Sequence, residues 1–246
     1  MSGPRGGKTE ANGSSLGATA SSNRGRAELL RWTARIGAVT ADSLACLQST
    51  SRASASARLA AARRAELLSR CHLLIGQPAL YAVTDAGMRA SGVEGLEPSR
   101  ISVANAPHTI ACARVAATLQ RRYPDHLVTG ERELRRDERR AGRPLASAVL
   151  DRAIGHRTRL HRPDLVLWPP REAGGAPIAI EVELTVKAPR RLSEICRAWA
   201  RSRDVAGVVY LASPAARGAL ARAIEQTCAE ERIALLPLDE PSPRGG

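Results

Sequence analysis

The sequence has 246 residues and a formal net charge of +13 at pH 7, with 37 lysine and arginine residues against 24 aspartate and glutamate residues. This length suits two modest domains. No apolar run reaches the length of a membrane-spanning helix, and the N-terminus lacks the apolar centre of a signal peptide. The sequence therefore predicts a cytoplasmic protein with no membrane partner.

The positive charge comes almost entirely from arginine, because lysine occurs only as Lys8 and Lys187. A GC-rich genome explains arginine in place of lysine, but not the excess of cations over carboxylates. A positive field of this size favours a polyanionic partner, most simply nucleic acid. The five cysteines are odd in number and show no CxxC spacing. They predict reduced thiols rather than a disulfide framework or a zinc site.

Residues 1–24 are rich in glycine, serine and alanine and are expected to form a flexible tail. Residues 25–93 show the apolar spacing of three helices, followed by two short strands around a GQP turn and a helix that ends near Gly92. This order is that of a winged helix-turn-helix domain. A small protein-docking module would share it. The ending LYAVTDAGMRASG resembles that of bacterial winged-helix domains.

The third helix, within residues 49–68, would be the recognition helix of this domain. Ser51, Ser54 and Arg58 share one of its faces. Serine and arginine side chains suit phosphates and guanine edges. The candidate DNA-binding residues are Ser51, Arg52, Ser54, Arg58 and Arg63 on the helix, with Arg70, His72 and Gln77 in the wing.

The glycine, proline and serine content of residues 94–105 predicts a linker. Residues 106–238 then favour an α/β domain, whose strands alternate with helices that cover the sheet. Residues 239–246 are expected to fray. Helices are expected at residues 108–124, 131–142, 190–203 and 214–231, and extended segments at residues 125–130, 163–169, 178–187, 205–213 and 232–238.

Two carboxylates could meet at one end of the expected sheet. Asp164 heads the strand PDLVLWP, and Glu181 lies in the next strand, IAIEVELTVK. Carboxylate oxygens suit Mg²⁺ or Mn²⁺, and a nearby lysine would hold the attacking water or the transition-state charge. Glu181 and Glu183 could instead pair with an arginine, and the candidates for such pairing are Arg162, Arg190 and Arg191.

Two histidines lie close to these residues. His161 could act as a base or ligand, or could be a plain surface residue beside Arg162. His108 opens a helix, a position that favours a structural role over ligation.

The segment RPD followed by Glu181 and Glu183 on the next strand resembles the PD-(D/E)xK restriction-endonuclease-like fold, which has a mixed sheet flanked by helices. The resemblance assigns Asp164 and Glu181 to metal binding, and Glu131 or Glu133 to the glutamate of the first helix. Glu183 stands where the family has lysine. Lys187 projects to the same strand face about 13 Å further on. A bend after Thr185 would let its side chain reach the site.

The whole arrangement, from the winged helix through TGERELR and HRPDLVL to IEVELTVK, resembles the replication-relaxation family over residues 26–236. This resemblance implies a role on double-stranded DNA in the replication or relaxation of plasmids and mobile elements. One hypothesis is a Mg²⁺-dependent nickase or nuclease that uses the carboxylates and Lys187. The other is a non-enzymatic replication or transcription regulator, whose degenerate second domain binds DNA or forms a homodimer.

Overall fold

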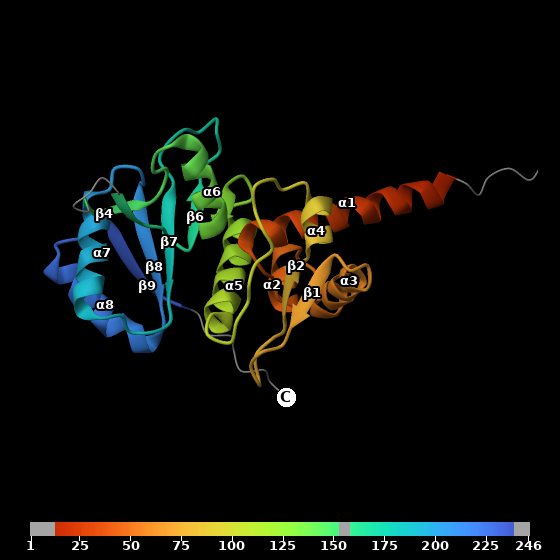
Figure 1. Ribbon diagram of the computed structural model, residues 1–246, viewed down its shortest axis with the longest axis horizontal. Coiled ribbons are helices and arrows are strands. Elements are labelled where there is room, and N and C mark those ends of the chain that lie inside the picture. The colour runs from red at the N-terminus through yellow and green to blue at the C-terminus, as the bar shows by residue number, and fades with distance from the viewer. Residues whose placement is uncertain (1–12, 153–157, 239–246) are drawn as a thin grey trace, which may run out of the picture.

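The computed structural model describes residues 13–152 and 158–238, which form an α/β fold with eight helices and nine strands (Figure 1). Within these residues, no helix combines the length and the apolar character that crossing a membrane requires.

The N-terminal part contains the helices and the hairpin in the expected order. Thr40, Ser51 and Thr84 each begin a helix by accepting a hydrogen bond from a backbone N–H of its first turn. Gly87 is required in the last of these helices, because a Cβ there would lie 2.0 Å from the carbonyl oxygen of Leu67. The elements are α1 (Gly13–Ile36), α2 (Ala41–Leu47), α3 (Arg52–Arg64), β1 (Leu68–Cys71), β2 (Leu80–Val83) and α4 (Asp85–Ser91).

The first helix departs from the expected flexible tail. It begins at Gly13, twelve residues before the expected start of the domain, and its first part leaves the body of the molecule (Figure 1). Extending a formed helix requires only one new fixed residue per hydrogen bond, so an alanine- and serine-rich segment can continue a helix that tertiary contacts stabilise further along. The expectation for residues 1–12 lies outside the described residues.

The C-terminal part is built around a five-stranded sheet of order β3-β6-β7-β8-β9. β3, β6 and β7 pair antiparallel, whereas β7, β8 and β9 pair parallel, so the sheet is mixed as expected. Its elements are α5 (Ala106–Arg122), β3 (Leu127–Gly130), α6 (Glu131–Ala141), β6 (Leu165–Trp168), β7 (Ile178–Glu183), α7 (Pro189–Arg201), β8 (Gly207–Ala212), α8 (Pro214–Gln226) and β9 (Ile233–Pro237).

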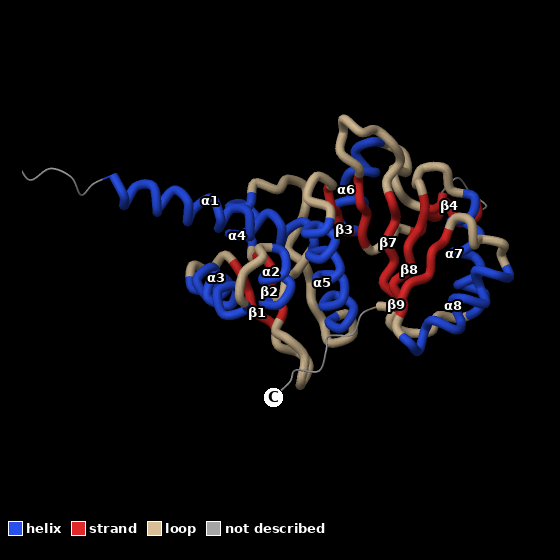
Figure 2. Tube along the Cα trace, turned by 180° about the vertical axis from the view of Figure 1, so that it is seen from behind, coloured by secondary structure: helices blue, strands red, loops and turns tan. Residues whose placement is uncertain are grey.

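Helices cover both faces of this sheet (Figure 2). One face packs against α7 and α8 around the fully buried Trp199. The other face packs against α5 through residues such as Val115, Leu165 and Ile180. Alternate residues of β7 therefore point to different cores, which places Glu181 and Glu183 on the face that α7 covers.

Two features of this part were not expected. β4 (Ala148–Arg152) and β5 (Thr158–His161) form a separate antiparallel pair, which sequence patterns did not reveal because polar and basic residues interrupt its apolar positions. The strand expected at residues 178–187 ends at Glu183, whose carbonyl group accepts the Ser213 N–H from the end of β8 before the chain turns toward α7.

The N-terminal and C-terminal parts pack against each other, and the segment between them is bound to the C-terminal part. Trp32 and Ile36 of α1 contribute to the core on the α5 face of the sheet. The segment expected as a linker, residues 94–105, is hydrogen-bonded to α6: Arg132 donates to Ser99 Oγ at 2.6 Å, and Arg136 donates to the Glu94 carbonyl oxygen at 3.0 Å.

Candidate functional site

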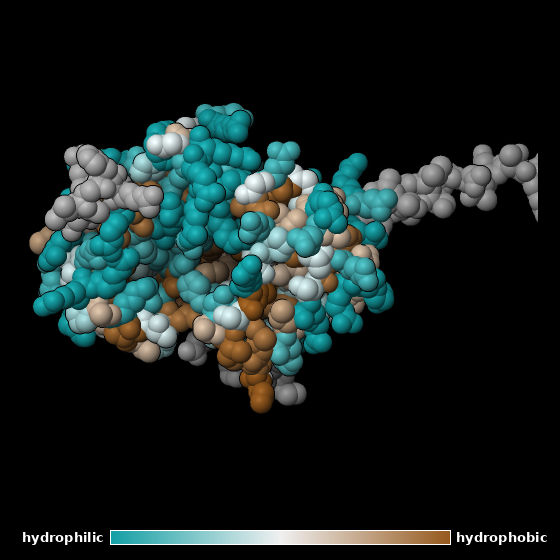
Figure 3. Space-filling view, in the orientation of Figure 1, coloured by the Kyte–Doolittle hydropathy of each residue, from teal (hydrophilic) through white to brown (hydrophobic). Residues whose placement is uncertain are grey.

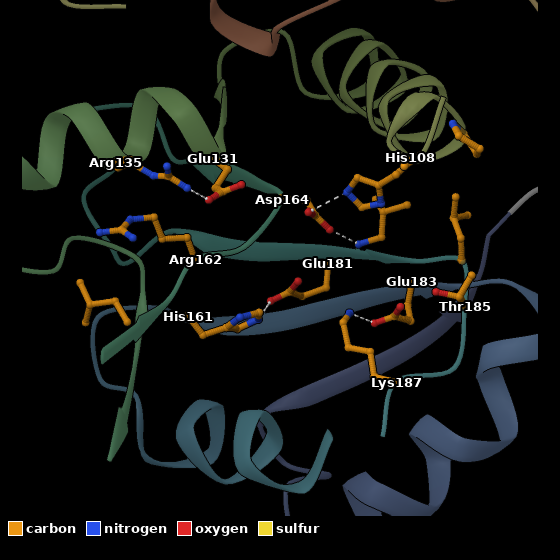
Figure 4. Close-up of a pocket in the computed structure, with 15 residues that line it drawn as sticks. His108, Glu131, Arg135, His161, Arg162, Asp164, Glu181, Glu183, Thr185 and Lys187 are labelled. Atoms are coloured by element: carbon orange, nitrogen blue, oxygen red, sulfur yellow. Dashed lines mark hydrogen bonds and ion pairs between the residues drawn. The ribbon is translucent and has the colours of Figure 1, made fainter. Parts of the chain in front are cut away.

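A cavity of about 620 Å³ opens at one end of the five-stranded sheet (Figure 4). β6 starts and β7 ends at this edge, because the two strands run antiparallel. α6 also begins here, with its first N–H bonded to the Asp164 carbonyl oxygen at 3.0 Å. The five candidate catalytic residues all line this cavity: Asp164, Glu181, Glu183, Glu131 and Lys187.

Asp164 directly precedes β6, and both oxygens of its carboxylate have partners. Oδ2 accepts a 2.8 Å hydrogen bond from the N–H of Val182, and Oδ1 lies 2.9 Å from Nε2 of His108 on α5. The hydrogen bond to Asp164 raises the pKa of His108, even though burial opposes this shift. The sequence favoured a structural role for His108, but the structure places its ring in the wall of the cavity.

Glu181 is buried in β7 and receives two hydrogen bonds on Oε1. His161 Nε2 lies 2.6 Å from this oxygen, and the Trp199 indole N–H donates to it at 3.2 Å. Burial lowers the pKa of His161, but the charge of Glu181 and the hydrogen bond to it outweigh burial and raise this pKa overall. Burial also raises the pKa of Glu181, and His161 offsets part of that shift. His161 is thus a largely buried partner of Glu181 rather than a surface residue.

Glu183 and Lys187 form an ion pair across the bend that follows β7 (Figure 4). The alternation with Glu181 suggested that Lys187 continues the strand, but β7 ends before this residue. The loop turns instead, so that Lys187 Nζ contacts the buried Glu183 carboxylate. The bend closes the gap that a straight strand would have left. It places a cation and an anion together where the restriction-endonuclease-like pattern has one lysine.

The arginines that were considered as partners for the glutamates of β7 bind other acids. Arg162 Nε donates to the buried carboxylate of Glu138 at 2.9 Å. Arg191 donates to Glu194, one turn further along α7, at 2.7 Å. Arg190 is exposed. Glu181 and Glu183 therefore do not pair with these arginines. Their observed partners are His161 and Trp199 for Glu181, and Lys187 for Glu183.

The two glutamates at the start of α6 have different surroundings. Glu131 lines the cavity and contacts Arg135, which also lines it. Glu133 is buried on the other side of the helix, where Arg35 Nε donates to both carboxylate oxygens at 2.8 and 3.0 Å. Arg136 donates to the same carboxylate at 3.1 Å. Glu131 is therefore the site residue of the two, and Glu133 connects α6 to α1.

One group of three side chains at this site could hold a metal ion. The ligand atoms of His108, Cys112 and Asp164 all lie within 4.8 Å of one another. The sequence predicted a magnesium site at Asp164 and Glu181, and this group shares only Asp164 with it. The signal that was missed is the four-residue spacing of His108 and Cys112, which places both on one face of α5.

The candidate DNA-binding side chains lie on the surface of the N-terminal part. α3 and the β1–β2 hairpin carry them on exposed positions. Ser51 uses its hydroxyl group to cap α3 through the Ser54 N–H at 3.1 Å. The exposed set is Ser51, Arg52, Ser54, Arg58, Arg63, Arg70, His72 and Gln77.

Some of these side chains already have partners within the chain. Arg52 Nε lies 2.8 Å from the Asp42 carboxylate of α2, and Arg58 donates to the side chain of Gln48. Both contacts are exposed, so they contribute little to stability and can exchange for phosphate contacts.

The hairpin between β1 and β2 ends in an apolar tip. Leu73 and Ile75 are exposed there, Ile75 completely. Figure 3 shows an apolar projection at the place where Figure 1 draws this hairpin. The β1–β2 hairpin therefore combines polar groups along its strands with an apolar end.

A comparison with protein-family models found no matching family, and comparisons with curated proteins and with solved structures found no significant match.

Proposed function

We propose that this chain binds double-stranded DNA through α3 and the β1–β2 hairpin and cleaves or nicks a phosphodiester bond at the cavity beside β6 and β7, in a metal-dependent reaction. In this proposal the N-terminal part is a winged helix-turn-helix domain, and the C-terminal part is a restriction-endonuclease-like domain. The observation that carries the proposal is the convergence of five residues, chosen from sequence alone, on one cavity.

The donor chemistry of the cavity fits a hard divalent cation. Asp164, Glu181 and Glu131 bring carboxylate oxygens to its wall, and such oxygens are the ligands that Mg²⁺ prefers. Asp164 and Glu181 would hold the cation, which when bound polarises a phosphoryl oxygen and acidifies a water molecule.

The chain's own groups would position these ligands and balance charge. The Val182 N–H fixes the orientation of Asp164, and His161 with Trp199 fixes that of Glu181. Lys187 would offer its ammonium group to the phosphate, as a donor directed at the developing charge.

A supercoiled plasmid tests this function directly. With Mg²⁺ or Mn²⁺, the wild-type chain should convert supercoiled plasmid to the nicked or linear form, whereas Asp164→Ala and Glu181→Ala should not. Glu172→Ala is a matched control, because Glu172 is an exposed acid on the turn between β6 and β7. Wild-type conversion no faster than that of the two alanine variants, with every divalent cation tried, would exclude the cleavage function.

A second function, DNA binding without cleavage, is favoured by one observation. The lysine position of the restriction-endonuclease-like pattern holds Glu183, and this glutamate occupies Lys187 in an ion pair. The domain would then act as a degenerate nuclease-like module in a replication or transcription regulator. Salt-sensitive duplex binding without any nicking would support this alternative.

The setting of either function rests on the resemblance to the replication-relaxation family. It suggests replication or relaxation of plasmid or mobile-element DNA in the cytoplasm. The number of copies of the chain on DNA, including a homodimer, can be measured by sedimentation of the complex with a duplex.

A further inference from the structure

Three side chains of different chemistry meet at the edge of the cavity. His108 and Cys112 lie one turn apart on α5, and Asp164 heads β6. Asp164 Oδ1 is 2.9 Å from His108 Nε2, and the same nitrogen is 3.3 Å from Cys112 Sγ. Figure 4 shows the His108 ring directed at the Asp164 carboxylate. A single nitrogen thus faces an oxygen and a sulfur from two separate elements.

This donor set differs from that expected for Mg²⁺. Imidazole nitrogen and thiolate sulfur suit Zn²⁺ and chemically similar cations such as Co²⁺ and Fe²⁺, whereas Mg²⁺ prefers oxygen alone. The sequence had argued against a zinc site because the cysteines form no close pairs. A mixed site needs only one cysteine, so the absence of close cysteine pairs does not exclude it.

The distances are close to those of a tetrahedral site. Zinc lies about 2.0–2.1 Å from nitrogen or oxygen and about 2.3 Å from sulfur, which separates the ligand atoms by roughly 3.4–3.6 Å. The observed separations of 2.9 and 3.3 Å are shorter by a few tenths of an ångström. Widening them by that amount would give tetrahedral separations, and the third separation, from the Asp164 oxygen to Cys112 Sγ, is within 4.8 Å.

The backbone of β7 fixes the orientation of the Asp164 carboxylate. The Val182 N–H donates to Oδ2 at 2.8 Å, which leaves Oδ1 directed toward His108. Hydrogen bonds of this kind orient a ligating carboxylate and increase metal affinity. His108 and Asp164 line the cavity, so a cation between them would have protein on one side and the cavity on the other.

We propose that His108, Cys112 and Asp164 bind one thiophilic divalent cation of the Zn²⁺ class, with an open coordination position toward the cavity. Three protein ligands and one open position are the pattern of reactive rather than structural zinc sites. This inference rests on the geometry of the three residues and holds whether or not the chain cleaves DNA.

Cobalt titration of the full chain tests the site without DNA. After removal of bound metal by a chelator, Co²⁺ should bind with about one equivalent per chain and give the near-ultraviolet thiolate-to-cobalt band together with visible bands of tetrahedral intensity. Zn²⁺ should displace it, and a large excess of Mg²⁺ should not. An absence of the thiolate band in the wild-type chain would overturn the proposal.

Substitutions identify the ligands. Cys112→Ser should abolish the thiolate band, and His108→Gln and Asp164→Asn should each weaken Co²⁺ binding by about tenfold or more. Cys228→Ser is the matched control, because Cys228 is an exposed free cysteine remote from the cavity lining. A band that persists in Cys112→Ser, or that disappears in Cys228→Ser, would contradict the assignment. Circular dichroism confirms that each variant is folded, and Cys112→Ala provides a second test at that position.

Discussion

Lys187 and Glu183 lie four residues apart and form an ion pair across the bend that follows β7. The bend places the one lysine of the described residues at the cavity instead of leaving it along the strand. Because the Glu183 carboxylate is buried and the Lys187 side chain is partly exposed, the glutamate determines where the ammonium group can lie.

If the cavity cleaves DNA, Lys187 supplies a charge that arginine at a neighbouring position cannot replace. Lys187→Gln should lower the nicking rate by about 100-fold, the loss typical of removing one preorganised donor. Arg190→Gln is the control, because Arg190 is an exposed cation three residues away. The nicking rate with saturating Mg²⁺ measures both. Equal rates in Lys187→Gln and wild type would remove Lys187 from the reaction.

Glu133 should matter for stability far more than its neighbour Glu131. Glu133→Gln leaves Arg35 without its buried counter-charge, whereas Arg136 keeps its ion pair with Asp137, so the free energy of unfolding should fall by about 3 kcal/mol, chiefly through Arg35. Glu131→Gln removes an exposed pair on the same helix and should change it by less than about 0.5 kcal/mol.

Urea denaturation followed by circular dichroism measures these two variants. Similar losses of stability in both would show that the contact between Glu133 and Arg35 does not stabilise the junction of α1 and α6.

The pair formed by His161 and Glu181 should make stability fall as pH rises. The pKa of His161 is raised above 6.5, so its contribution is complete below that pH and is lost as pH rises through the folded-state pKa. Burial raises the pKa of Glu181 above 4.5, which gives a slope of the same sign at lower pH.

The reference for this measurement is His161→Gln/Glu181→Gln, which keeps a polar side chain at both positions but removes their titration. In the presence of a chelator, the free energy of unfolding of the wild type relative to this variant should decline as pH rises from 4.5 past 6.5, the ordinary pKa values of the two groups. A difference that stays constant or grows over this range would contradict the raised pKa values.

Duplex binding should depend on the arginines of α3 and of the β1–β2 hairpin, and not on exposed cations of the C-terminal part. Arg58→Ala and Arg63→Ala should each reduce the slope of log affinity against log salt by about 1, as expected for one lost phosphate contact. Arg171→Ala is the control, because Arg171 is exposed on the turn between β6 and β7. Fluorescence anisotropy with a labelled duplex at several salt concentrations gives the slopes. A larger reduction in Arg171→Ala would move the binding surface away from α3.

The sequence predicted the elements whose patterns are local. The end of α4 at Gly92, and the alternation of strand and helix after β6, correspond to short-range rules of capping and periodicity. The sequence also predicted that Asp164 and Glu181 meet at one end of the sheet. This is possible because the start of β6 and the end of β7 lie together in an antiparallel pair.

The features that sequence patterns did not reveal depend on contacts between distant segments. His108 reaches Asp164 only because α5 lies across the sheet, 56 positions earlier in the chain. Glu131 and Glu133 project to opposite sides of α6, and which of the two faces the cavity depends on where Arg35 of α1 and the sheet pack against the helix. The sequence raised a bend after Thr185 as one possibility, but alternation along a strand cannot show that β7 stops already at Glu183.

The packing of α1 against the sheet domain determines how the chain can be divided. Trp32 and Ile36 belong to the same apolar core as Val128 and Leu165, on the far side of residues 94–105. A fragment that ends within those residues would expose two large apolar side chains, and its complement would lose the surface that covers α5. Truncation at this segment should yield aggregating pieces, so separate study of the two halves requires surface substitutions at Trp32 and Ile36 rather than a simple cut.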